Sequence, residues 1–278
     1  MKYCRFLFEG KPHYGKVESR AGEFWIVDLA SAPEEDLPFH LAHLRAEAAG
    51  EVVTDLAAFD FDPMPLSAAQ LLAPVTPSKI LCVGRNYGEH AKELGNEVPT
   101  EPLIFSKPPS SLLAPGGVVR MPLSSQRVDF EGELALVIGK RISRFNAGGD
   151  WRSAIRGYTL ANDVTARDLQ KKEAQWTRPK GWDTFCPVGP IVSDEIDPAA
   201  GVMLETRVNG ELKQHASTAD FIFSIPELLA YITQAITLDP GDLLLTGTPS
   251  GVGPLKAGDR VEVSIDGLGV LANTFQPE

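Results

Sequence analysis

The chain of 278 residues is poor in cysteine and in cationic side chains, and each shortage excludes a class of protein. Cys4, Cys82 and Cys186 are too few and too scattered for a disulfide framework or a cysteine-type zinc site, and an odd count fits a reducing cytoplasm. Lysine and arginine total 26 against 37 acidic residues, a formal charge of −11. Because such a surface repels phosphate backbones and anionic lipids, we expect neither nucleic acid nor membrane as a partner.

Long apolar runs and several familiar motifs are also missing. No apolar run approaches the roughly 20 residues that span a bilayer, and residues 1–10 lack the apolar stretch of a signal peptide. The chain has no phosphate-binding loop, nucleophile elbow or His-Glu-x-x-His motif, and the glycine-rich residues 247–253 lack dinucleotide-binding spacing. These absences argue against nicotinamide enzymes and zinc peptidases, and we expect a cytoplasmic protein.

Prolines divide the chain into two parts. Pro63, Pro65, Pro74 and Pro77 interrupt residues 62–78, and proline disfavours continuous helix or strand. Residues 1–74 are predicted to form a small β-rich domain, and residues 75–278 a larger one. The short elements expected in the first domain are strands at 3–8, 15–18 and 24–29 and a helix at 37–49.

Strand patterns dominate the second part. Regular alternation of strand and long helix is missing, which argues against a doubly wound fold or a (β/α) barrel. We therefore predict a β-rich α+β fold, a roll or a barrel. Strands are expected at 79–83, 103–105, 133–138, 157–162, 203–208, 242–246 and 260–265, and helices at 89–94, 151–155, 164–172 and 225–235.

Acidic residues open the strand pattern at residues 129–138. Since strand side chains alternate between faces, Asp129, Glu131 and Glu133 share one face, and the second half is apolar on both faces and should be buried. Carboxylates two residues apart on a strand repel each other unless a cation compensates them, and Mg²⁺ or Mn²⁺ prefers oxygen ligands. The alternative is an exposed strand end with solvated acids, and these residues alone do not decide between the two.

Two further acidic positions suggest chemistry. Asp163 ends the strand pattern at 157–162, where it would either add a third carboxylate to a metal site or cap the next helix. His90 and Glu93 lie three residues apart on a short predicted helix and so face the same side. A carboxylate beside an imidazole fixes its tautomer and makes it a general base that can activate water, although a surface pair is the alternative.

Several segments together resemble the fumarylacetoacetate hydrolase family. They occur in the family's order from residue 79 to about residue 273. The matching pieces are Gly-Arg-Asn-Tyr at 84–87 with His90 and Glu93, Phe-Ser-Lys-Pro at 105–108, Asp-Phe-Glu-Gly-Glu-Leu at 129–134, Asn-Asp-Val-Thr-Ala-Arg-Asp at 162–168, Lys-Gly at 180–181, Thr-Gly-Thr-Pro at 246–249 and Gly-Val-Gly at 251–253.

The resemblance implies a mixed β-sandwich roll, usually a homodimer, that binds Mg²⁺ or Mn²⁺ and an anionic keto-acid substrate. By the matching motifs, the metal ligands would be Glu131, Glu133 and Asp163. The catalytic residues would be His90, Glu93 and Lys180. The substrate-binding residues would be Arg85, Arg167, Gln170 and Thr248, whereas Lys107 is expected to have a surface or ion-pair role.

Arg85 stands where the fumarylacetoacetate-cleaving enzyme has a further acidic ligand, and that enzyme also has a longer N-terminal domain. The chain therefore resembles the acylpyruvate hydrolase, oxaloacetate decarboxylase and 2-hydroxyhepta-2,4-diene-1,7-dioate isomerase branch. The implied reaction is metal-dependent hydrolysis of a C–C bond in an acylpyruvate-type diketo acid, with a metal-stabilised pyruvate enolate as leaving group. Oxaloacetate decarboxylation and dienedioate isomerisation at the same site are alternatives, and a non-enzymatic metal-binding or ligand-binding protein is an alternative of another class.

Overall fold

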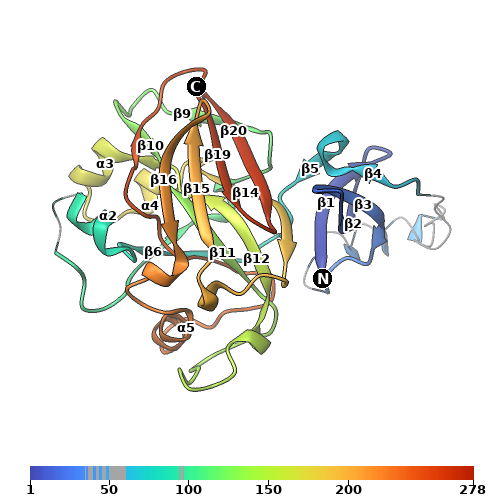
Figure 1. The fold of residues 1–278 in the computed structure, drawn as a ribbon, viewed down its shortest axis with the longest axis horizontal. Helices are drawn as coiled ribbons and strands as arrows, with labels where there is room; N and C mark the ends of the chain where they lie inside the picture. The colour runs from blue at the N-terminus through green and yellow to red at the C-terminus, as the bar shows by residue number, and fades with distance from the viewer. Residues whose placement is uncertain are drawn as a thin grey trace.

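The protein is described here from a computed structural model, covering residues 1–34, 36, 40, 41, 44, 45, 48, 49, 61–93, 95 and 97–278. The helix expected at 37–49 lies largely outside these residues. Among the described residues, no helix is long and apolar enough to cross a bilayer. The fold is β-rich with mixed sheets, as predicted, and Figure 1 shows the short helices on the outside of the sheets.

A central mixed sheet runs through the molecule in the order β4-β3-β2-β1-β14-β12-β11-β17-β6-β7. Most neighbours are antiparallel, but β17 and β6 are parallel. Two short strands attach at its side: β5 pairs with β1, and β8 pairs with β14. The bounds are β1 Lys2–Phe8, β2 Lys11–Arg20, β3 Glu23–Ala30, β4 Met64–Pro65, β5 Gln70–Leu72, β6 Ile80–Gly84, β7 Leu103–Lys107, β8 Leu112–Leu113, β11 Gly132–Ile138, β12 Ile155–Asn162, β14 Cys186–Ser193 and β17 Leu243–Leu245.

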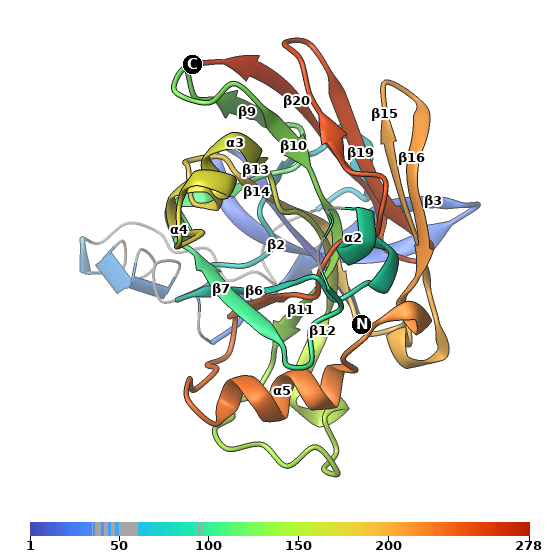
Figure 2. The same cartoon turned by 90° about the vertical axis from the view of Figure 1, so that its left-hand side faces the viewer.

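Two smaller sheets complete the β structure. One has the order β16-β15-β19-β20-β9 and the other β13-β10-β18. Figure 2 shows the five-stranded sheet beside α2, away from α5. The bounds are β9 Val118–Met121, β10 Val128–Phe130, β13 Thr165–Ala166, β15 Met203–Val208, β16 Glu211–Ser217, β18 Gly253–Pro254, β19 Arg260–Ile265 and β20 Gly269–Pro277; the helices are α2 Gly88–Glu93, α3 Arg167–Lys172, α4 Thr177–Lys180 and α5 Ile225–Thr233.

The N-terminal strands β1 to β5 lie to one side of the larger body (Figure 1). Their sheet nevertheless continues into the central strands, because β1 pairs with β14 through Lys2 opposite Ser193 and Tyr3 opposite Val192. The division of the chain near residue 74 stays a prediction.

Two of the expected helices differ from the structure. The helix predicted from residue 164 begins only at Arg167, because Thr165 and Ala166 first pair with β10 as strand β13. The stretch predicted as a helix at 151–155 is a 3-10 turn at Arg152–Ala154. Ile155 already belongs to β12, where it pairs with Ile138.

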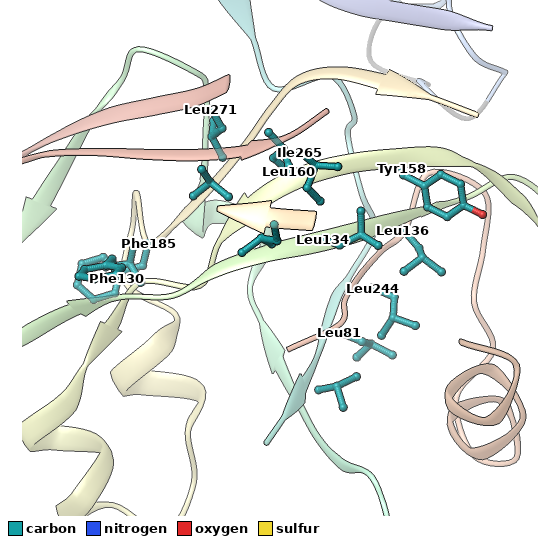
Figure 3. Close-up of a cluster of buried hydrophobic side chains, with 14 of the residues drawn as sticks. Leu81, Phe130, Leu134, Leu136, Tyr158, Leu160, Phe185, Leu244, Ile265 and Leu271 are labelled. Atoms are coloured by element: carbon teal, nitrogen blue, oxygen red, sulfur yellow. The ribbon is translucent and has the colours of Figure 1, made fainter. Parts of the chain in front are cut away.

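Strand β11 is buried on both faces, as its sequence predicted. Leu134 and Leu136 pack in one cluster with Leu160 of β12 and with side chains of β19 and β20, which joins the central and five-stranded sheets (Figure 3). Ala135 and Val137 belong to a second cluster on the opposite face. The residues just before this strand therefore sit at the end of a rigid, fully covered element.

Replacing Leu136 with alanine should lower the free energy of unfolding by about 2–5 kcal/mol, because a cavity forms between the two sheets. Urea unfolding followed by circular dichroism would measure this. Leu123→Ala is the control, since that side chain is 76% exposed and should cost far less. Equal losses in the two variants would contradict the packing described here.

Candidate active site

Glu131 lies where the chain passes from β10 into β11, and so from one sheet into another. Its backbone N–H donates to Asn162 Oδ1 at 2.9 Å, and its carbonyl accepts from the Asp163 N–H at 2.8 Å. The end of β12 thus holds Glu131 and Asp163 next to each other.

Glu133, two residues further along β11, completes a group of three carboxylates. One oxygen from each of Glu131, Glu133 and Asp163 lies within 4.8 Å of the others, and the residues are only 4%, 1% and 1% exposed. The interpretation as an exposed, solvated strand end is therefore wrong. The helix-cap interpretation of Asp163 is wrong as well, because the residue at the N-cap of α3 is Ala166.

Asp129 shares the acidic pattern but not the group. Its carboxylate accepts hydrogen bonds from Arg127 Nε at 2.8 Å and Arg127 Nη2 at 2.9 Å, and from Arg167 Nε at 2.9 Å. Asp129 therefore orients Arg167, whose Nη2 donates to Glu131 and whose Nη1 donates to Gln170 Oε1 at 2.7 Å.

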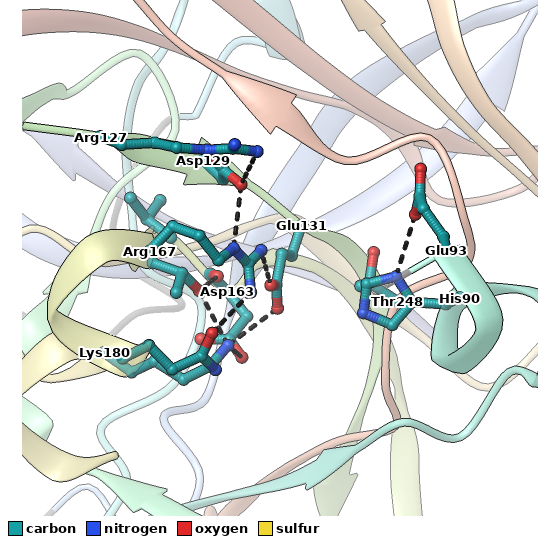
Figure 4. Close-up of polar contacts among 12 residues, drawn as sticks. His90, Glu93, Arg127, Asp129, Glu131, Asp163, Arg167, Lys180 and Thr248 are labelled. Carbon is teal, nitrogen blue, oxygen red and sulfur yellow. Dashed lines mark hydrogen bonds and ion pairs between the residues drawn. The ribbon is translucent and has the colours of Figure 1, made fainter. Parts of the chain in front are cut away.

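Two buried lysines face the carboxylates, and Figure 4 shows Lys180 beside Glu131 and Asp163. Lys180 Nζ donates to Glu131 Oε2 and Thr165 Oγ1, both at 2.8 Å, and also to Asp163. Lys107 Nζ donates to Asp163 Oδ1 at 2.6 Å. Of the two roles expected for Lys107, the structure shows the ion pair, and it is buried.

Burial and charge act differently on the three acids. Burial would raise the pKa of Glu131, but the charges of Lys180 and Arg167 outweigh it and lower that pKa. The pKa of Glu133 is raised well above its ordinary value by burial and by repulsion from Asp163 and Glu131. A divalent cation bound to these oxygens would relieve that repulsion, and three convergent carboxylates are the oxygen ligands that Mg²⁺ and Mn²⁺ prefer. The residues therefore fit such an ion.

A closed set of hydrogen bonds fixes the backbone between the two glutamates. Gly132 N–H donates to Gln214 Oε1 at 3.0 Å, Gln214 Nε2 donates to Thr248 Oγ1 at 2.8 Å, and the Thr248 hydroxyl donates to the Gly132 carbonyl at 2.8 Å. Sequence reasoning missed Gln214, which lies 82 residues from Gly132 and carries no local signal. Because the Thr248 hydrogen already has an acceptor, its hydroxyl can meet a ligand only as an acceptor.

The predicted His90 and Glu93 pair forms on α2. His90 Nδ1 lies 3.4 Å from Glu93 Oε2, and Glu93 also accepts from the Gly251 N–H at 3.0 Å. Burial, together with the charge of Arg167, lowers the pKa of His90 despite the opposing carboxylates of Glu131 and Glu93. The imidazole is therefore neutral near pH 7, and with Nδ1 donating to Glu93 its Nε2 is the basic atom.

The loop before α2 is anchored by Asn86, which is completely buried. Asn86 Nδ2 donates to the Thr246 carbonyl at 2.9 Å, and Oδ1 accepts from the Phe223 N–H at 2.8 Å. These bonds tie the segment that carries His90 to the loop after β17 and to the residues just before α5.

The three carboxylates and the His90 and Glu93 pair line one cavity of about 540 Å³. Figure 4 shows the His90 and Glu93 pair on one side and Glu131, Arg167 and Lys180 on the other. The functional roles stay predictions, but the positions converge: all ten predicted site residues line the cavity, namely Arg85, His90, Glu93, Glu131, Glu133, Asp163, Arg167, Gln170, Lys180 and Thr248.

Comparison with known proteins identifies the class of protein that carries this site. The family model for the fumarylacetoacetate hydrolase C-terminal domain matches residues 79–276, so the chain belongs to the fumarylacetoacetate hydrolase family. Members of this family are enzymes.

Two of the relatives similar to this chain are named oxaloacetate tautomerases. An oxaloacetate tautomerase of Bos taurus, described as mitochondrial, is 40% identical over 94% of this chain and 87% of its own length. The oxaloacetate tautomerase YisK of Bacillus subtilis is 42% identical over 84% of this chain and 81% of its own length.

Solved structures agree with this assignment. A 2-hydroxyhepta-2,4-diene-1,7-dioate isomerase from Mycobacterium marinum is 37% identical, covers 100% of this chain and 99% of its own, and superposes with a TM-score of 0.81. A fumarylpyruvate hydrolase from Pseudomonas aeruginosa, solved with Mn²⁺ and pyruvate, is 30% identical, covers 75% of this chain and 92% of its own, and has a TM-score of 0.67.

Replacing Glu133 with glutamine tests the metal site. Because the Glu133 pKa is raised in the folded protein, its ionisation costs stability as the pH rises, and glutamine removes that cost while still accepting from the Gly247 N–H. The metal-free variant should melt above metal-free wild type, by more at pH 8 than at pH 5. Mn²⁺ should raise the melting temperature of wild type but not of E133Q.

The exposed exchange Glu211→Gln is the control and should leave the Mn²⁺ response unchanged. If E133Q kept the full response to Mn²⁺, Glu133 would not be a ligand.

Replacing Gln214 with methionine should leave three buried groups without their hydrogen-bond partner, namely the Gly132 N–H and the Thr248 and Pro249 oxygens. We expect a loss of about 1–3 kcal/mol in unfolding free energy and weaker Mn²⁺ binding by calorimetry. The exposed exchange Gln126→Met should change neither quantity. Full Mn²⁺ affinity in Q214M would mean that this network does not position Glu131 and Glu133.

Proposed function

We propose that the protein is a divalent-metal-dependent enzyme that interconverts the keto and enol forms of oxaloacetate or a closely related α-keto dicarboxylate. One observation carries this proposal: a neutral, buried imidazole and a group of three carboxylates line the same cavity. Keto–enol conversion requires a proton acceptor beside the carbon and a stabilising charge beside the oxygen. The two relatives named oxaloacetate tautomerases, each matched over more than four fifths of both chains, support the choice of substrate.

The charge of the cavity wall favours an anionic substrate. Among the described residues, five cationic and four carboxylate side chains line the cavity, so even without a metal the wall is not negative. A divalent cation held by Glu131, Glu133 and Asp163 would add two positive charges and polarise a keto oxygen. An acidic protein can thus bind a dicarboxylate, because the local charge differs in sign from the net charge.

His90 would remove the proton from the carbon next to the keto group. Glu93 accepts from Nδ1, so Nε2 carries the lone pair that takes the proton, and the lowered pKa keeps the base unprotonated near neutral pH. The enolate oxygen would take a proton from solvent water to give the enol. In the reverse direction the enol O–H proton would return to water and protonated His90 would give its proton back to carbon.

Lys180 would hold the negative charge that develops on the substrate oxygen. Burial alone would lower the Lys180 pKa, but Asp163 and Glu131 outweigh it and raise the pKa well above its ordinary value. Lys180 therefore stays charged and acts as a fixed cation rather than as a proton donor. Arg167, oriented by Asp129, would contribute in the same way.

Hydrolysis of an acylpyruvate is the second candidate. The same His90 could activate water instead of a substrate carbon, and the relative solved with Mn²⁺ and pyruvate is a fumarylpyruvate hydrolase. Hydrolysis needs room for the water as well as the substrate, which distinguishes it from simple proton transfer.

A substrate panel with Mn²⁺ separates the candidates. We expect faster enol-to-keto conversion of oxaloacetate than cleavage of acetylpyruvate or fumarylpyruvate, with His90→Ala reducing the rate by about 10²–10⁴-fold while Mn²⁺ binding is retained. His215→Ala is a matched control, because His215 also lies beside a glutamate, at 3.3 Å from Glu205, but is exposed. Near-normal turnover by H90A would refute the assigned base, and faster acylpyruvate cleavage would favour the second candidate.

A further inference from the structure

Two cationic side chains on the cavity wall have no carboxylate partner within the described parts of the chain. Arg127 and Arg167 pair with Asp129, and Lys180 pairs with Glu131. Arg85 and Lys171 line the same cavity, and neither forms an ion pair with a described residue. These two side chains are therefore available to an anionic ligand.

Arg85 is half-buried, whereas Lys171 is exposed. The Arg85 guanidinium lies over the Trp176 ring in a cation–π contact, with its carbon 5.9 Å from the ring centroid. Gly84 permits this approach, since a Cβ at that position would lie 2.9 Å from Leu103 Cδ2 and Trp176 Cζ3. The contact places at the cavity wall a planar, forked donor that matches the geometry of a carboxylate.

The aromatic pair beside Arg85 also connects it to the carboxylate group. Trp176 packs edge-on against Phe105, with ring centroids 5.3 Å apart. Lys180 Nζ lies 4.9 Å from the Phe105 centroid. One wall of the cavity therefore carries an aromatic pair with a cation at each end, and only the Lys180 end faces Glu131 and Asp163.

The backbone conformation of Arg85 also indicates a role in ligand binding. Its φ of 59° lies in the left-handed region, which arginine rarely adopts and glycine adopts freely. A non-glycine residue in this conformation costs stability, and such positions cluster at ligand-binding sites. No ion pair of Arg85 within the described structure offsets that cost.

We propose that Arg85, stacked on Trp176, binds the second carboxylate of an α-keto dicarboxylate and is the residue that makes the site prefer dicarboxylates to keto monocarboxylates. The keto-acid end would lie toward Lys180 and the distal carboxylate toward Arg85. The orientation of the keto-acid end rests on the proposed function; the role of Arg85 as the second anion site does not depend on which reaction follows.

Calorimetry of the Mn²⁺-loaded protein with two matched ligand pairs tests this proposal. Oxaloacetate is compared with 2-oxobutyrate, and 2-oxoglutarate with 2-oxovalerate; in each pair a methyl group replaces the distal carboxylate. Wild type should bind the dicarboxylate of at least one pair about tenfold more tightly or better. Arg85→Met and Arg85→Gly should lose this preference and keep their affinity for the monocarboxylate.

Lys171→Met is the matched control, because it removes the other unpaired cation of the same cavity and should keep the preference. R85G adds an independent readout: glycine relieves the left-handed backbone, so its melting temperature should not fall below that of R85M. A lower melting temperature of R85G than of R85M would contradict the strain argument.

Three outcomes would overturn the proposal. The preference for dicarboxylates could survive in both Arg85 variants, it could be lost in K171M instead, or it could be absent from wild type. If wild type bound no ligand of either pair, the keto-acid class and this proposal would be rejected together. A dicarboxylate preference that depends on Arg85, without any turnover of oxaloacetate, would uphold the proposal and reject only the proposed reaction.

Discussion

The burial of three carboxylates in one small space is the constraint on which the rest of the site depends. Glu131, Glu133 and Asp163 are almost inaccessible to bulk water, so most of their charge must be balanced by cations or by protonation. Lys180 and Lys107 supply part of that balance, and in the metal-free protein the remaining repulsion is strongest on Glu133. Stability and the proposed chemistry are therefore linked here, since the divalent cation that would relieve the repulsion is also the one proposed to polarise the substrate.

The loop that follows β17 joins the two halves of the site. Thr246 accepts from Asn86, Gly247 donates to Glu133, and Thr248 donates to Gly132, so the backbone near the carboxylates and the segment leading to His90 share one support. Gly251 donates to Glu93 from the same loop. The His90 and Glu93 pair and the three carboxylates thus keep their relative positions through a few backbone contacts.

Local patterns predicted much of this arrangement, and long-range contacts account for what they missed. Alternation along residues 129–138 placed Glu131 and Glu133 on one face of a buried strand, and spacing on a short helix paired His90 with Glu93. The same alternation could not separate Asp129 from the other acids, because its exclusion depends on Arg127 and Arg167. Assignment of individual ligands came from the family resemblance. The fold class was predicted from strand-rich patterns, but the pairing of β1 with β14 joins residues some 190 positions apart and has no signature in either strand.

Glu131 occupies a junction between two sheets, since β10 belongs to the three-stranded sheet and β11 to the central one. The position of the Glu131 carboxylate therefore depends on how the two sheets sit relative to each other. The Asn162 side chain and the Asp163 N–H bind the Glu131 backbone at this junction, which resists relative movement of the sheets there. A metal ion bound by Glu131, Glu133 and Asp163 would add a further tie across the same junction, so the proposed cofactor would stabilise the contact between the two sheets as well as the charges of the site.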